Sequence, residues 1–355
     1  MQAHQTDTSA SSDQRSCLPV REMAEHCNGY KGADTKRGIF QLTTTLALFA
    51  GACWLMHYGL HSSAFWITAL LLLPAAGLLT RVFIFQHDCG HGSFLNSKKA
   101  NDWTGRLLGI LTVTPYDFWR RAHNLHHATS GDLDRRSIGG IDTITVSEYR
   151  ALSKWKQWGY RLYRNPFILL LFGTPFYTII GQRLPFNEST GFYEGYKTLP
   201  RSSIWQSVML TNVGIAVFYG TFALFVGWGP LLAVYLPILV VTAWIGGWLF
   251  YIQHQFEDTY WEKNEDWDIH EAALLGSSYY ALPRVLQWFT GNIGLHHIHH
   301  LCLKIPNYKL QECMDSYPEL RTINRLTLRE SLSCLKFKLW DEEKNQLVPF
   351  SAVHA

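Results

Sequence analysis

The residues with the clearest chemical potential are histidines. Sixteen are present, and ten of them fall in four short segments: HDCGH at 87–91, HNLHH at 123–127, QHQ at 253–255 and HHIHH at 296–300. Residues three and four positions apart lie on the same side of an α-helix. The spacing therefore predicts that the imidazole rings of each cluster can aim at one point, as ligands of a metal ion must.

Nine of these histidines are candidate metal ligands. Packing so many rings together without an ion would bury many polar nitrogen atoms and would cause repulsion on protonation. His297 lies about 100° around a helix from His296, which favours a supporting role, although its spacing from His300 leaves that role open. The clustered candidates are His87, His91, His123, His126, His127, His296, His299 and His300, whereas the isolated His254 could equally be an ordinary core histidine.

The ligand chemistry points to two ions rather than one. Zinc sites are filled by four ligands, so eight or nine imidazoles are too many for a single ion. Imidazole binds iron, copper, zinc and nickel, and no pair of the seven cysteines has CxxC spacing. We therefore expect a dinuclear iron or copper centre. Carboxylates that could orient ring N–H groups, or simply face solvent, are Asp88, Asp117, Asp132, Asp134, Glu257 and Asp258.

Two long uncharged stretches predict how these segments are held. Only 17% of the residues are charged, and none lies in the 43 residues of 38–80 or the 55 residues of 202–256. One helix crosses a bilayer with about 20 residues, so each stretch fits two membrane-spanning helices joined by a turn. The predicted fold is an all-α integral membrane protein with two hairpins, whose spans cover about 39–57, 64–85, 204–226 and 231–253.

The positions of the basic residues predict the orientation. Neither hairpin turn contains Lys or Arg, so the positive-inside rule places the flanks and all four histidine segments in the cytoplasm. A third uncharged stretch, 165–182, contains Pro and Gly. If it crossed the bilayer, His254 would emerge opposite His87, so we expect it to be interfacial or re-entrant. The expected divisions are a polar cytoplasmic N-terminal tail (1–37), a membrane domain (38–320) and a cytoplasmic C-terminal segment (321–355).

The histidine segments resemble those of a known family. HDCGHGSF, WRRAHNLHH and GNIGLHHIHH are similar to the three histidine boxes of the membrane-bound fatty acid desaturases, and YIQHQFED is similar to the segment that carries an additional ligand. The resemblance covers about residues 38 to 320. It implies four transmembrane helices under a cytoplasmic helical cap, and a non-haem diiron centre held by the nine histidines above.

The resemblance also implies a reaction. Family members use O₂ to remove two hydrogens from adjacent methylenes of an acyl chain, leaving a cis double bond. The HxxxH first box, and Phe250 where the acyl-CoA branch carries Asn, favour the acyl-lipid branch, closest to bacterial and plastid Δ12 (ω-6) enzymes. The expected substrate is an acyl chain of a membrane glycerolipid, and the expected location is a bacterial inner membrane. Double-bond position, acyl carrier and oligomeric state stay open.

Electrons must come from another protein. The chain lacks the HPGG haem signature of a fused cytochrome b5, a GxGxxG reductase fingerprint and a cysteine cluster for iron–sulfur. A separate donor of ferredoxin or cytochrome b5 type is implied. The basic pairs Arg120/Arg121, Arg135/Arg136 and Lys154/Lys156 could dock an acidic donor or contact membrane phosphates. A net charge of +3 gives no basic footprint for nucleic acid.

Three other functions are compatible with parts of the pattern. A hydroxylase of acyl chains or alkanes would use the same diiron centre and differ in the product. A divalent-metal transporter would need polar or ionisable ligands within its spans, whereas the predicted spans lack charged residues. A b-haem electron carrier would need paired histidines on facing spans.

Overall fold

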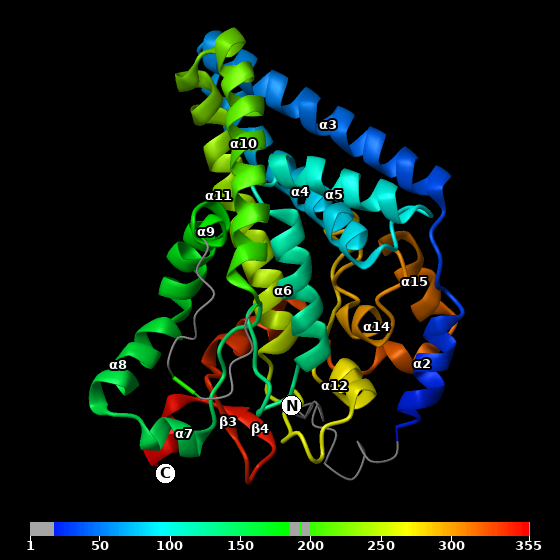
Figure 1. Ribbon diagram of the computed structural model, residues 1–355, viewed down its shortest axis with the longest axis vertical. Coiled ribbons are helices and arrows are strands. Elements are labelled where there is room, and N and C mark those ends of the chain that lie inside the picture. The colour runs from blue at the N-terminus through cyan, green and yellow to red at the C-terminus, as the bar shows by residue number, and fades with distance from the viewer. Residues whose placement is uncertain (1–17, 185–191, 194–198, 355) are drawn as a thin grey trace, which may run out of the picture.

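The computed structural model describes residues 18–184, 192–193 and 199–354, and it is mostly helical (Figure 1). Within this part of the chain, four helices are long and apolar enough to cross a membrane. They form two hairpins, α3 (Thr35–His61) with α4 (Phe65–His91), and α10 (Arg201–Val226) with α11 (Trp228–His254). The predicted all-α fold with four apolar helices in two hairpins is confirmed.

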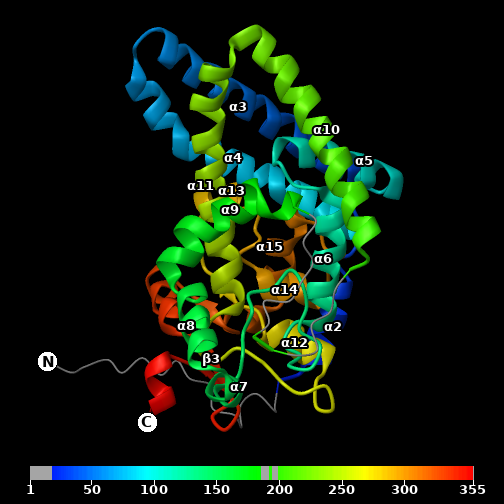
Figure 2. The same ribbon diagram turned by 60° about the vertical axis from the view of Figure 1, so that its left-hand side comes forward.

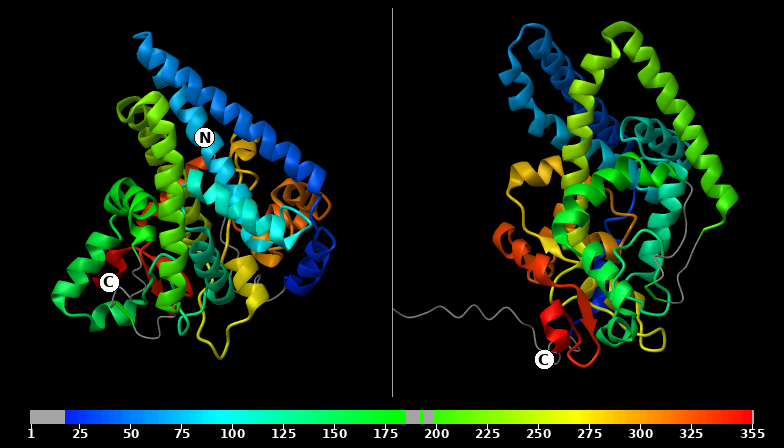
Figure 3. Two further views of the ribbon diagram at one scale, coloured as in Figure 1. Left: turned by 45° about the horizontal axis from the view of Figure 1, so that its top comes forward. Right: turned by 90° about the vertical axis from the view of Figure 1, so that its left-hand side faces the viewer.

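Local sequence signals set the ends of these helices. The Asp34 side chain accepts hydrogen bonds from the backbone N–H groups of Lys36 and Arg37, which would otherwise lack partners at the start of α3. Gly227 adopts φ +81° between α10 and α11, a conformation that favours glycine in so tight a turn. The two hairpins stand together on one side of the cap (Figure 3), and α4 packs against both α3 and α11.

Two of the apolar helices continue beyond the predicted spans and carry part of the histidine set. Helix α4 runs to His91 and α11 runs to His254, so three predicted ligands lie on the final turns of long helices. These histidines are therefore positioned by the packing of α4 against α11 and not by flexible loops.

The first part of the cap lies between the two hairpins in sequence, after α4 and before α10. Its helices are α5 (Lys98–Leu111), α6 (Tyr116–Thr129), α7 (Val146–Ala151), α8 (Lys154–Tyr163), the π-helix η1 (Phe167–Gly173), α9 (Thr174–Ile179) and the 3₁₀ turn η2 (Gly181–Arg183). The uncharged stretch 165–182 corresponds to η1, α9 and the start of η2; η1 and α9 lie beside α11 (Figure 1), and η2 contacts α10. None of these three short elements is long enough to cross a bilayer.

The second part of the cap follows α11 and contains both sheets. Its helical elements are α12 (Ile269–Leu275), α13 (Arg284–Phe289), α14 (His296–Leu301), α15 (Asn307–Asp315), η3 (Pro318–Arg321), α16 (Leu328–Ser331), η4 (Leu332–Lys336) and η5 (Phe350–His354). Strand β1 (Tyr279–Tyr280) pairs in parallel with β2 (Arg325–Leu326). Strand β3 (Leu339–Asp341) pairs antiparallel with β4 (Gln346–Val348). These strands, which are only two or three residues long, were not predicted from the sequence.

A helix also lies in the region predicted as a polar N-terminal tail. Helix α2 (Val20–Asn28) packs against α12 and α14, and it buries Val20, Met23, Ala24 and Cys27. These four positions follow the i, i+3, i+4, i+7 pattern of one helix face. The pattern is short and lies among polar residues, so it was not recognised in the sequence. Residues 1–17 of the predicted tail lie outside the described residues.

Candidate metal centre

The four histidine segments meet where the apolar helices enter the cap. Helix α4 contributes its last turn, α6 its C-terminal half, α11 its last residue and α14 its whole length. Residues up to 213 positions apart, from His87 to His300, are thereby brought into one cluster. It contains the eight rings predicted from spacing and the ring of His254, which the resemblance added.

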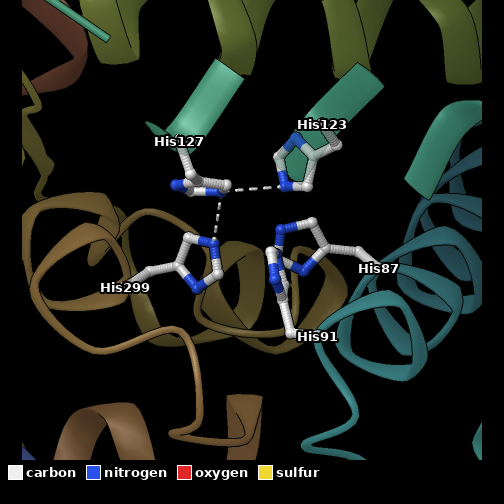
Figure 4. Close-up of side chains that lie close together, drawn as sticks. All are labelled: His87, His91, His123, His127 and His299. Carbon is white, nitrogen blue, oxygen red and sulfur yellow. Dashed lines mark hydrogen bonds between the residues drawn. The ribbon is translucent and has the colours of Figure 1, made fainter. Parts of the chain in front are cut away.

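Five of the rings form a first group (Figure 4). One nitrogen atom from each ring lies within 4.8 Å of the others. Nε2 of His127 is 3.0 Å from Nε2 of His123 and 3.3 Å from Nε2 of His299. The Nε2 atoms of His87 and His91 are buried without a hydrogen-bond partner. Free acceptor nitrogens inside such a group are what a cation requires.

The other four rings form a second group beside the first. His126, His254 and His300 place nitrogen atoms within 4.8 Å of one another. Nε2 of His296 lies 3.1 Å from Nε2 of His254 and 3.0 Å from Nε2 of His300. The rings of His127 and His300, whose centroids are 4.1 Å apart, connect the two groups.

Each HxxHH segment divides its rings between the groups, which corrects the expectation that the histidines of one box aim at a single point. His126 faces the second group, whereas His123 and His127 face the first. Adjacent residues are about 100° apart around a helix, so neighbouring histidines on one face point to its two sides. The same division separates His299 from His300 on α14.

The distances between nitrogen atoms fit metal ligation. Imidazole nitrogens bind metals at about 2.0–2.1 Å, so two ligands at roughly 90–110° around one ion lie roughly 3 Å apart. The Nε2 pairs of His126 with His254, and of His254 with His296, are separated by 3.2 and 3.1 Å. Two unprotonated ring nitrogens at this distance repel each other unless a cation or proton lies between them.

Other groups fix the orientation of individual rings. Nδ1–H of His254 donates to the backbone carbonyl of Gly276 at 3.0 Å, so Nε2 is free to face the second group. Nδ1–H of His87 donates to Oδ1 of Asp88 at 3.1 Å. The Asp88 carboxylate also accepts from the backbone and side-chain N–H groups of Asn307, at 2.7 and 2.9 Å.

Three other carboxylates suggested from sequence contact groups other than the histidines. Asp117 pairs with Arg106, and Asp132 pairs with Arg135. Asp134 accepts from the backbone N–H of Asn264. Proximity to the histidine segments in sequence therefore placed Asp88 among the candidates but did not distinguish it from the other five carboxylates.

His297 lies outside both groups. Its Nε2 is 2.9 Å from the carbonyl oxygen of Leu320, and its ring lies beside that of Tyr279. The contact joins α14 to η3, so in this structure the side chain connects elements of the cap.

Burial keeps the cap histidines neutral. Desolvation, followed by repulsion from neighbouring imidazoles, lowers the pKa of His123, His127 and His299 well below the usual range. The same causes act on His126, His296 and His300. Neutral imidazole is the form that binds metals, so the environment favours ligation at neutral pH.

Aromatic side chains of α6 and α11 lie against the histidine cluster, and a pocket adjoins it. Trp119 stacks on His123 with ring centroids 4.7 Å apart, and Phe250 lies 5.4 Å from the rings of both His126 and His254. A cavity with about 520 Å³ of empty space is lined by Phe250, His126, His254 and Gln255 among others, so it opens onto the second group. Phe250 precedes His254 by one helical turn, and this spacing was the available signal for its contact with the site.

Comparison with known proteins gives one consistent result. The family model described as fatty acid desaturase matches residues 64–324, which include all four histidine segments. A protein named fatty acid desaturase from Bacillus subtilis (strain 168) is 41% identical over 333 residues, covering 94% of this chain and 91% of that protein.

Two acyl-lipid enzymes are more distant relatives. An sn-1 acyl-lipid omega-3 desaturase (ferredoxin) from Synechocystis sp. is 30% identical over 245 residues, covering 67% of this chain and 64% of the relative. An sn-1 oleoyl-lipid 12-desaturase from Anabaena variabilis is 25% identical over 271 residues, covering 72% of each.

Proposed function

The chain belongs to the fatty acid desaturase family, and we propose that it introduces a cis double bond into an acyl chain of a membrane glycerolipid through a diiron centre. Family membership makes it an oxidoreductase, and its four long apolar helices indicate a membrane protein. The observation that carries the proposed metal chemistry is the pair of adjacent histidine groups at the membrane end of the cap.

Two iron ions would be held by all nine predicted histidines. The five of the first group would surround one ion, and the four of the second group would surround the other. Iron bound there would activate O₂ and remove hydrogen from an unactivated methylene, which no amino-acid side chain can do. In the net reaction, two hydrogens leave the acyl chain, and O₂ with two further electrons and two protons becomes two molecules of water.

The protein's own groups would position and protect this centre. Asp88 and the Gly276 carbonyl orient the rings of His87 and His254. Trp119 and Phe250 place apolar surface against the histidines and limit access of water. Fixed geometry is also what selects the carbon atoms that react, since orientation contributes strongly to such catalysis.

The proposed double-bond position is Δ12 (ω-6). Its support is the HxxxH spacing of the first histidine box together with Phe250 one turn before His254. Relatives of this chain are named for both omega-3 and 12-position activity, so the position is measured directly in the experiment below.

The proposed electron donor is a separate protein of ferredoxin or cytochrome b5 type. A relative whose name specifies ferredoxin supports this choice. Of the basic residues suggested for docking, Arg136 is buried and paired with Glu148, and Arg135 is paired with Asp132. Lys154 on the exposed side of α8 stays a candidate contact. We further propose that the cap is cytoplasmic, the membrane is a bacterial inner membrane, and residues 1–37, 38–320 and 321–355 form the tail, membrane domain and C-terminal segment.

Expression in a host that lacks polyunsaturated lipids tests the function. Fatty acids of the total lipid are analysed by mass spectrometry with location of the double bonds. We expect a product two hydrogens lighter than its precursor, with the new bond at Δ12. A product that gains one oxygen would instead identify a hydroxylase.

Substitution of a predicted ligand tests the metal assignment. His299→Ala should lose iron from the purified protein and abolish product, because a ligand of the first group is removed. His61→Ala, at an exposed position at the end of α3, is the matched control and should keep both. Full activity and iron content in His299→Ala would refute the proposed ligand set.

A further inference from the structure

A second hollow lies away from the histidine cluster, at the edge of the apolar helices. It is a groove with about 1290 Å³ of empty space between α5, the start of α6 and the first turns of α10. Figure 2 shows α10 descending beside α5 and α6. We refer to it as the α5–α10 groove.

The α5–α10 groove carries an excess of positive charge. Its charged lining consists of Lys98, Arg106, Arg120 and Arg121 with two carboxylates, Asp102 and Asp117. Both carboxylates are already engaged by cations. Asp102 lies 2.7 Å from Lys98 and 2.5 Å from Arg120, and Asp117 lies 2.8 Å from Arg106.

Arg121 is the basic residue of the groove lining that has no ion pair with a carboxylate. Its side chain is exposed and makes no ion pair or hydrogen bond with any described residue. It precedes His123 by two residues on α6, but it lines the groove and not the metal centre. A planar guanidinium in this position can bind a phosphate with two parallel hydrogen bonds.

Three apolar side chains of the lining are exposed. Trp103 and Leu107 of α5 and Leu210 of α10 are 56%, 62% and 66% exposed. Leu210 belongs to α10, a candidate membrane span, and Trp103 and Leu107 belong to α5, which packs against α10, so lipid chains rather than water are their expected neighbours.

The order of residues along α10 matches the order of layers in a bilayer. The lining residues Ser203, Gln206 and Ser207, near the beginning of α10 at the cap, are all polar, whereas Leu210 and then Thr211 lie one turn further into the membrane. A glycerophospholipid has the same arrangement, with a charged headgroup above its acyl chains. Trp103 beside the Arg106 guanidinium, 5.1 Å from its ring centroid, is also typical of a membrane interface.

We propose that the α5–α10 groove binds an anionic glycerophospholipid from the surrounding leaflet. Arg121 contacts the phosphate, with Lys98 and Arg106 nearby, and an acyl chain lies along Leu107 and Leu210. An acidic donor protein would match the charge but would leave the exposed apolar side chains next to a spanning helix without a partner, whereas a lipid matches both the cations and these apolar side chains. The proposal concerns binding alone and does not depend on the reaction assigned above.

Native mass spectrometry of the full-length protein in detergent tests this proposal. The protein is titrated with phosphatidylglycerol and, separately, with zwitterionic phosphatidylcholine of the same acyl chains. We expect a bound phosphatidylglycerol at lower concentration than phosphatidylcholine. Arg121→Gln should weaken phosphatidylglycerol binding about fivefold, the effect of one basic residue at an anionic membrane surface.

Two further variants separate a specific site from general charge. Arg284→Gln removes an exposed arginine from α13, outside the groove, and should leave binding unchanged. Gln206→Trp keeps the charge but fills the α5–α10 groove, and should weaken phosphatidylglycerol binding as Arg121→Gln does.

Three results would overturn the proposal: equal binding of the two lipids, equal losses in Arg121→Gln and Arg284→Gln, or full binding by Gln206→Trp. If Arg121→Gln kept lipid binding but raised the KM for the donor protein, the groove would be a protein-docking surface instead.

Discussion

Asp88 connects the first histidine segment to the far end of the cap. Its carboxylate is 2% exposed, accepts from Nδ1–H of His87, and receives two hydrogen bonds from Asn307 at the start of α15. A buried carboxylate that accepts a ligand's N–H orients the ring and increases its basicity. We therefore assign Asp88 to the positioning of His87.

Asp88→Asn should lower iron affinity about 10–100-fold, the usual effect of losing such a partner. The amide keeps the size and one acceptor oxygen, but it removes the charge and turns an NH2 donor toward either His87 Nδ1–H or the Asn307 N–H groups. Competition with an iron chelator measures the affinity. Asp315→Asn, an exposed carboxylate of α15 paired with Arg321, is the control, and equal affinities in the two variants would remove Asp88 from the site.

For single residues, the spacing of the clustered histidines predicted which rings lie together, because helical periodicity alone brings rings to a common face. It could not predict that His126 and His127 serve different groups, because that depends on where α11 and α14 approach α6. Asp88 was likewise indistinguishable from five other carboxylates, since its contact with Asn307 joins positions 219 residues apart.

A buried polar network joins α8, the end of α11 and the C-terminal segment. Arg164, which is fully buried, donates to the carbonyl of Asp142 and to the side chain of Gln255, the residue after His254. Lys338 lies in the same region, where its ammonium donates to the Tyr251 hydroxyl at 3.2 Å. The segment after α11 is thus attached to the helix that carries a predicted ligand.

Lys338 makes the stability of this network depend on pH. Burial, and then the nearby Arg164 charge, lowers the pKa of Lys338 to about 7, whereas an unfolded lysine titrates near 10.4. Below pH 7 both states are protonated and the full cost of the buried charge is present. Between about pH 7 and 10 the unfolded state binds more protons, so this contribution to stability rises with pH.

Lys338→Met should therefore stabilise the protein most at low pH. We expect a gain of about 1–3 kcal/mol near pH 6.5, because an apolar side chain removes the buried charge, and a smaller gain near pH 9.5. Thermal unfolding of the purified protein at both pH values measures it. The exposed Lys336→Met is the control, and a gain that did not shrink at the higher pH would contradict the assigned pKa.

Among the elements, the long helices were predictable and the short ones were not. The uncharged stretches that form α3, α4, α10 and α11 exceed what a soluble protein tolerates, so their length and type followed from composition. Helix α2 has only four apolar positions, and β1 and β2 have two residues each. Tertiary contacts decide such short elements, because their own residues bury too little surface to do so.

The whole molecule separates charge from apolar surface along one axis. The hairpin turns, at Ser62–Ser63 and Gly227, stand at the end of the molecule opposite the cap (Figure 1). The cap holds the histidine groups, and basic residues flank the helices only on its side. Because positively charged flanks are retained in the cytoplasm, we expect the turns outside and the histidine groups inside.

Thiol labelling of intact cells tests this orientation. Cysteine is placed at Ser63, an exposed position in the first turn, or at Glu265, an exposed position in the cap, after replacement of Cys17 and the half-buried Cys53. A membrane-impermeant maleimide should label Ser63→Cys in intact cells and Glu265→Cys only after permeabilisation. The remaining native cysteines are buried, so the unsubstituted background should stay unlabelled. Labelling of both variants from the same side would mean that the hairpins do not cross the bilayer, and the reverse pattern would place the histidine groups outside, away from a cytoplasmic electron donor.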